Sequence, residues 1–202
     1  MKVNLNSISK RAQSFISEPK FLNSDIPFDF EVSLDKSDKI LTVFYQGKSG
    51  DLNLLFSEAL AIFSKNRPIN ELWKINFREI ENFLRDENHL PAFQENLPEI
   101  ESALEKVKIS LIATVVKLQV GKELIELKSG ISHWEKLNLV SKNTWAESFV
   151  KHLGWQFIFC DGGVLTVAGT PSGVSNEGLQ LLFEKILETG EFVLPVKVVA
   201  VQ

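Results

Sequence analysis

The stretch FDFEVSL, residues 28–34, and the stretch ILTVFY, residues 40–45, decide the fold of the N-terminal half of this chain. Apolar and polar residues alternate along both, as in strands that bury one face. The polar residues DKSD, 35–38, lie between them and suit a hairpin turn. We therefore predict two antiparallel strands, at 28–34 and 39–46.

Helical patterns surround this hairpin. Apolar residues at helical spacing predict four helices, over about residues 5–17, 52–65, 71–73 and 77–85. Asp51, Asn70 and Asn76 stand where N-caps of the last three are expected, because their side chains can accept from the first free backbone N–H groups. This order of elements predicts a small antiparallel sheet packed by helices.

A longer helix is expected to begin at Leu97, and its end is ambiguous. Residues 109–120 are rich in β-branched side chains, which favour a strand, although their apolar positions also fit a continued helix. We favour the strand. The change of pattern suggests two regions, 1–108 and 109–202.

The C-terminal region is predicted to be α+β with at least three strands. Its expected helices cover about residues 143–153, capped by Ser141 and ended by Gly154, and the stretch after the N-cap Ser175. Its expected strands cover residues 155–160, 164–168 and 192–201. The first two are joined by Asp161-Gly162-Gly163, and Pro195 places the last at a sheet edge.

Composition narrows the classes of function. A formal charge of -4 and a pI near 5.5 argue against nonspecific nucleic-acid binding and against a polybasic membrane patch. No apolar run approaches the roughly 20 residues that span a bilayer. The N-terminal residues 1–7 lack the apolar core of a secretory signal, so the cytoplasm is the simplest location.

The ordered phrases of the N-terminal region resemble a known family. They are the hairpin from Phe30 to Lys39, the phrase GKSG at residues 47–50, the helical patterns that follow, and HLPAFQENL at residues 89–97. Over about residues 20–108 the chain is similar to SufE and to IscU, the NifU N-terminal domain. IscU proteins are scaffolds for iron–sulfur clusters, and SufE proteins accept persulfide sulfur from a cysteine desulfurase. The resemblance implies their shared α+β fold.

The thiols that perform the chemistry of this family are absent here. The family's three cysteine positions fall on Ser24, Gly50 and Gln94, and Asp25 and Asp51 lie beside two of them. Cluster iron requires soft thiolate ligands, so we expect neither a cluster nor persulfide transfer at this site.

The resemblance still implies a partner. We expect a divergent SufE/IscU-like protein that binds a cysteine desulfurase or another iron–sulfur assembly protein. The alternative is a noncatalytic interaction or regulatory protein unrelated to such clusters, because a fold does not fix a function.

Cys160 is the only cysteine and therefore the only candidate nucleophilic thiol. No internal disulfide or multi-cysteine metal site can form. The apolar neighbours at residues 157–159 favour a buried structural thiol, and the charge of Asp161 opposes a reactive one. The sequence favours a noncatalytic protein and leaves an enzyme that uses Cys160 as a weaker, third hypothesis.

Two further groups of residues are candidate sites. His89, His133 and His152 are scattered without metal-ligand spacing, so no metal site is expected. An acidic run reads most simply as a solvated face, and alternatively as a surface for docking a desulfurase. It consists of Glu79, Glu81, Asp86 and Glu87.

Overall fold

A computed structural model of the chain confirms the α+β class. It describes residues 7–25, 29–46, 51–86, 91–93, 97–120, 136–161, 164–170, 174–187 and 197–201. The chain forms two compact units, unit 1 at residues 1–111 and unit 2 at residues 112–202.

The predicted hairpin of unit 1 is confirmed. Strand β1 (Phe30–Leu34) pairs antiparallel with β2 (Ile40–Tyr45), with Phe30 opposite Tyr45 and Val32 opposite Val43. These four side chains are buried. On the other face the hydroxyls of Ser33 and Thr42 are 2.6 Å apart. The alternation in the sequence therefore set which face of the hairpin is buried.

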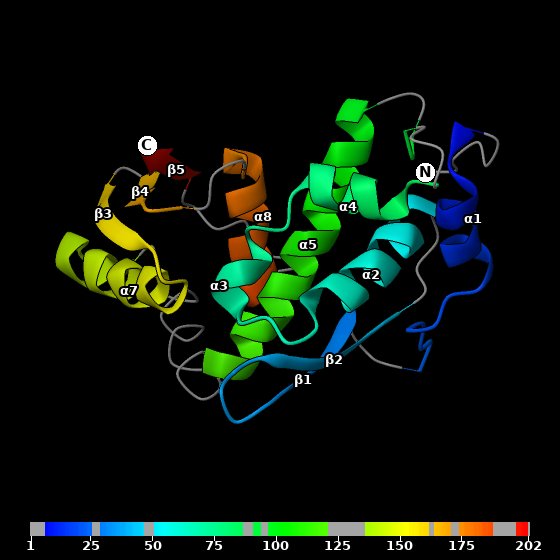
Figure 1. Ribbon diagram of the computed structural model, residues 1–202. Coiled ribbons are helices and arrows are strands. Elements are labelled where there is room, and N and C mark those ends of the chain that lie inside the picture. Colours follow the sequence, from blue (N-terminus) through cyan, green and yellow to red (C-terminus); the bar gives the residue numbers. More distant parts are fainter. Residues whose placement is uncertain are drawn as a thin grey trace. The chain divides into compact units, whose positions relative to one another are not determined.

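The described residues of unit 1 also form several helices. They include α1 (Lys10–Ser17), α2 (Asp51–Ser64), α3 (Ile69–Leu72) and α4 (Phe77–Leu84). Helix α2 contacts both β2 and α1, as Figure 1 shows. Leu55, Phe56 and Leu60 of α2 are completely buried and supply much of the core.

Helix α1 begins later than the sequence pattern suggested. The Ser9 side chain accepts a hydrogen bond from the Ala12 N–H at 3.0 Å and is the N-cap, so helical geometry begins at Lys10 instead of near residue 5. Ile8 pairs with Phe93 in an isolated bridge instead of extending the helix.

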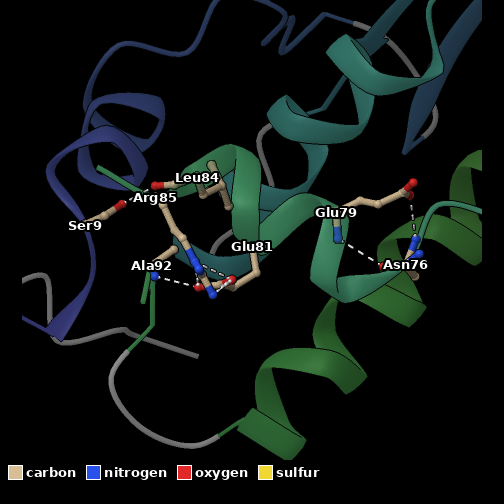
Figure 2. A network of polar contacts seen from close by, with 7 residues as sticks. All are labelled: Ser9, Asn76, Glu79, Glu81, Leu84, Arg85 and Ala92. Carbon is tan, nitrogen blue, oxygen red and sulfur yellow. Dashed lines mark hydrogen bonds and ion pairs between the residues drawn. The ribbon is translucent and has the colours of Figure 1, made fainter. Parts of the chain in front are cut away.

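The three predicted N-caps had different outcomes. Asn76 is confirmed: it caps α4 in a capping box with Glu79, which Figure 2 shows. The prediction of Asn70 as an N-cap was wrong, because Asn70 lies inside α3 and Pro68 is the N-cap. Asp51 was also wrong, because it is the first residue of α2 itself. Proline suits a helix start, since the first turn leaves N–H groups unpaired anyway.

The strand expected at residues 109–120 was wrong. Helix α5 runs unbroken over Leu97–Val120. Ile109, Val115 and Val116 are all buried in it. A β-branched residue costs a helix only about 0.7 kcal/mol or less, whereas burying one gains roughly 1.5–3 kcal/mol, so burial outweighs propensity here.

Over its described residues, unit 2 contains a three-stranded sheet and two helices besides the C-terminal end of α5. The elements are α7 (Leu139–His152), β3 (Gln156–Asp161), β4 (Val164–Ala168), α8 (Asn176–Leu187) and β5 (Lys197–Val201). The strand order is β3-β4-β5, antiparallel between the first two and parallel between the last two. A parallel pair needs a crossover, and α8 provides it. Leu165 and Val167 of β4 are buried, as are Leu182 and Phe183 of α8.

Local signals in unit 2 were predicted with mixed success. Ser175 is confirmed as a cap, because its hydroxyl accepts from the Gly178 N–H at 2.9 Å. Gly154 follows α7 with φ of +72°, the left-handed geometry expected of a terminating glycine. The prediction of Ser141 as the N-cap of α7 was wrong. Asn138 is the N-cap, and its side chain accepts from the Ser141 N–H at 2.9 Å. Two cap-forming residues lay one turn apart, and the earlier one is used.

The described part of β5 lies at one edge of the sheet, as Pro195 indicated, although residues 188–196 lie outside the described part. None of the helices in the described part of the chain combines the length and apolar character needed to cross a membrane.

Candidate functional site

Ser24 lies in a short segment that runs beside β2. We call residues 20–25 the Ser24 segment. Its main chain pairs with β2: the Tyr45 N–H donates to the Phe21 carbonyl at 3.1 Å, and the Asn23 N–H donates to the Tyr45 carbonyl at 2.9 Å. Ser24 and Asp25 follow and are exposed. The segment therefore presents a hydroxyl and a carboxylate to solvent from a main chain that is held in place.

The buried carboxylate of Glu58, in α2, holds the start of the Ser24 segment. Glu58 has 0% of its surface exposed. It accepts from the Lys20 N–H at 2.7 Å and from the Phe21 N–H at 3.1 Å. The hydroxyl of Tyr45 donates to the same carboxylate at 3.0 Å. Three donors compensate for the water that this carboxylate loses on burial.

Tyr45 is kept in its neutral, donating form by this arrangement. Burial raises the pKa of the Tyr45 hydroxyl, and the charge of Glu58 and the hydrogen bond to it raise that pKa further. The phenol thus serves as a hydrogen-bond donor to Glu58, and not as a base.

A second buried carboxylate holds the main chain that precedes Gln94. Glu81, in α4, is 6% exposed and accepts from the Ala92 N–H at 2.8 Å. The Arg85 guanidinium donates to the same carboxylate, with distances of 2.6 to 2.9 Å (Figure 2). Burial raises the pKa of Glu81, but the hydrogen bonds from Arg85 and Ala92 and the charge of Arg85 outweigh it, and the pKa is lowered.

The same corner of unit 1 is joined to α1. The Ser9 hydroxyl donates to the Leu84 carbonyl, and the Ser9 N–H donates to the Ala92 carbonyl at 3.0 Å. The carboxylate of Asp86 accepts from the Lys10 N–H at 2.9 Å and from the Arg11 N–H at 3.0 Å. These N–H groups belong to the first turn of α1 and have no partner within the helix, and a negative charge is favourable there.

The solvated face expected of the acidic run is confirmed at Glu79, which is exposed, and was wrong at Glu81, which is buried. Glu81 is buried and paired, Asp86 binds the start of α1, and Glu79 completes the capping box of α4. Glu87 lies outside the described residues. Three of the four carboxylates thus have structural partners, and the interpretation of this run as a docking surface stays a prediction.

The convergence of the three family positions stays a prediction. Ser24 is exposed on its segment, but Gly50 and Gln94 lie outside the described residues, as does the side chain of Asp51. The structure does place an anchored main-chain group close in sequence to two of them. Glu58 binds the N–H groups three and four residues before Ser24, and Glu81 binds the N–H two residues before Gln94.

Cys160 is a buried thiol at the end of β3. It is 2% exposed, and the side-chain amide of Asn143 holds its main chain. The Cys160 N–H donates to Asn143 Oδ1 at 2.9 Å, and Asn143 Nδ2 donates to the Cys160 carbonyl at 3.1 Å. Burial raises the pKa of the Cys160 thiol, and although Lys142 opposes this, the charge of Asp161 adds to it. A buried thiol with a raised pKa is a poor nucleophile.

The histidines form no described site. His89 and His133 lie outside the described residues, and so does the side chain of His152, the last residue of α7. Over the part of the chain that the structure describes, no three histidine, cysteine or acidic side chains are grouped so that they could hold a metal ion.

Sequence reasoning missed Glu58, although its position carried a signal. Leu54, Leu55, Ala61 and Ile62 stand three and four residues away on either side, so Glu58 falls on the apolar face of its helix. A carboxylate on such a face has to find donors or stay protonated. Comparisons of the chain with known protein families, curated proteins and solved structures gave no match. Function is therefore inferred from the residues and their geometry.

Proposed function

We propose that this chain is a divergent relative of SufE and IscU that binds a protein of iron–sulfur cluster assembly, such as a cysteine desulfurase, without accepting sulfur or holding a cluster. The motivation is the ordered resemblance over about residues 20–108, with Ser24, Gly50 and Gln94 at the thiol positions. A serine hydroxyl is neither a persulfide acceptor nor a soft iron ligand.

The observation that carries the proposal is the anchored Ser24 segment. Its main chain is bonded to β2 through Tyr45 and to the buried carboxylate of Glu58, whereas Ser24 and Asp25 remain exposed. A surface segment that is already ordered loses less conformational entropy when a partner binds it. The geometry therefore favours recognition by a protein, with Asp25 as a charged contact at its tip.

The proposal is tested with the cysteine desulfurase of the same host. We expect the two proteins to form a complex by calorimetry, and we expect Asp25→Arg to weaken it about tenfold, the usual order for one reversed charge in an interface. Glu101→Arg, at an exposed position of α5, is the matched control and should leave the affinity unchanged. Absence of a complex with any desulfurase or other cluster-assembly protein of that host would sink the proposal.

A second measurement concerns the chemistry. Anaerobic incubation with iron and sulfide should produce no cluster absorbance. Incubation with desulfurase and cysteine should leave Cys160 without added sulfur by mass spectrometry, because the thiol is buried. A cluster spectrum or a persulfide on Cys160 would contradict the proposed loss of sulfur chemistry. Purification with an unrelated partner would favour the alternative, a regulatory protein without a role in cluster assembly.

A further inference from the structure

The outer edge of β1 carries main-chain groups that have no partner among the described residues. Tyr45 uses its N–H and carbonyl to bind the Ser24 segment, so it points them away from β1. In an antiparallel ladder, the residue opposite such a residue also points its groups away. Phe30 is opposite Tyr45, so the N–H and carbonyl of Phe30 face the outer edge of β1, and by alternation those of Val32 and Leu34 do too.

The contrast with β2 shows that the edge of β1 is unusual. The outer edge of β2 is covered at both ends, by the Ser24 segment at Tyr45 and by residues 66–67 at Ile40. The Ile40 N–H donates to the Arg67 carbonyl at 3.1 Å, and the Asn66 N–H donates to the Ile40 carbonyl at 2.7 Å. Within the described ranges, no group bonds the outward N–H or carbonyl of Phe30 or Val32. An unpaired strand edge is a template for another strand.

The charges beside this edge determine which side chains an incoming strand should carry. Glu31 is exposed and has no ion-pair partner among the described residues. Asp35 follows β1, and its carboxylate accepts from the Ser37 N–H at 2.7 Å and from the Lys39 N–H at 3.0 Å. The charge of Lys39 already acts on Asp35, so Glu31 is the carboxylate that favours an incoming strand with a basic side chain opposite it.

A second copy of β1 is a poor occupant for the same reason. Antiparallel pairing centred on Val32 would set Asp29 opposite Asp35 of the other copy. Pairing shifted by one repeat would set Glu31 opposite Glu31. Like charges directly opposite each other destabilise a strand pair.

We propose that the outer edge of β1 binds an extended segment of a partner polypeptide, which adds as a strand beside Phe30, Val32 and Leu34 and places a lysine or arginine opposite Glu31. The main-chain groups supply affinity and Glu31 supplies selectivity, as in other cases of strand addition. This surface is independent of the Ser24 segment and of the role in cluster assembly.

The test uses the full chain and short capped peptides in which valine alternates with lysine or, as the control, with glutamate. We expect the lysine peptide to bind at submillimolar concentration and to slow hydrogen exchange at the amides of Phe30 and Val32. Glu31→Lys should weaken the lysine peptide about tenfold and strengthen the glutamate peptide. Methylating alternate peptide nitrogens should abolish binding, because strand addition needs those N–H groups.

Three results would overturn the proposal. One is binding that survives peptide methylation or does not respond to Glu31→Lys, because the main chain or the charge would then be irrelevant. Another is slow exchange at Val32 in the free, dilute protein, which would mean that this chain already covers its own edge. The last is slow exchange that appears only as protein concentration rises, which would identify a second copy as the occupant.

Discussion

Glu58 in unit 1 and Asn143 in unit 2 perform the same structural task with different chemistry. Each is a helix side chain that holds the main chain of a distant segment. Glu58 gathers the N–H groups of Lys20 and Phe21, whereas Asn143 bonds both the N–H and the carbonyl of Cys160. A carboxylate can only accept, but an amide donates and accepts, so each side chain matches the groups that it meets.

The two side chains also differ in whether they cover the edge of a strand. The amide of Asn143 satisfies the outward groups of Cys160 as a neighbouring strand would, so part of the edge of β3 is closed. In unit 1 the anchors act on connecting segments, and the outer edge of β1 has no such side chain among the described residues. Closing an edge guards against unwanted pairing, and an open edge can be used for binding.

Glu58→Gln should cause the largest loss of unfolding free energy. The amide would turn an NH₂ group towards N–H or O–H donors, leaving at least one of them buried without an acceptor. We expect unit 1 to lose about 2–4 kcal/mol of unfolding free energy. Urea titration followed by NMR measures this, with the indole signal of Trp73 reporting on unit 1. Glu101→Gln, at an exposed position, should change stability by less than about 0.5 kcal/mol. Equal effects of the two changes would refute the anchoring role.

Asn143→Asp should cause the next largest loss of unfolding free energy. A carboxylate oxygen would face the Cys160 carbonyl, and one hydrogen bond would become a repulsion. We expect unit 2 to lose about 1–3 kcal/mol at neutral pH, as read from the indole signal of Trp155. The loss should shrink as pH falls, because a protonated carboxyl can donate again.

Asn138→Asp is the matched control on the same helix. At the N-cap of α7 the side chain only accepts, from the Ser141 N–H. Aspartate is as good a cap as asparagine and its charge suits a helix N-terminus, so stability should not fall. If both changes cost the same, the donor role of Asn143 is wrong.

The sequence revealed the elements better than it revealed these anchors. Alternation located the hairpin, and helical spacing located α2 and α4 with the Asn76 cap, because these signals lie within a few residues. Helix α5 was mistaken for a strand after residue 108, because burial of Ile109 and Val115 is a tertiary effect. Glu58 and Lys20 meet across 38 positions of the chain, so no local pattern could pair them. The link to iron–sulfur assembly stays a prediction from the resemblance.

Acid should lower the unfolding free energy of unit 1 through the carboxylate of Glu81. The pKa of Glu81 is lowered in the folded protein, mainly because the hydrogen bonds and charge of Arg85 and the Ala92 N–H outweigh the cost of burial. Its contribution is therefore complete above the pKa of the unfolded chain, roughly 4.3, and is lost as pH falls through the lower folded pKa. Urea titrations between neutral pH and about pH 3 should show this loss in unit 1. Glu81→Gln should flatten the slope, and an unchanged slope would contradict the assignment.

The smallest effect concerns how the two units end a helix. Asn66, just after α2, and Gly154, just after α7, both have left-handed backbones, with φ of +64° and +72°. No heavy atom lies within 4 Å of where a Cβ of residue 154 would be, so Gly154→Ala should cost only the backbone strain, about 1–2 kcal/mol at most. Asn66→Gly should change stability by less than about 0.5 kcal/mol, because both residues tolerate this geometry. Thermal unfolding of the two variants measures the difference. A larger loss from Asn66→Gly than from Gly154→Ala would mean that the side chain of Asn66, and not its backbone geometry, matters to unit 1.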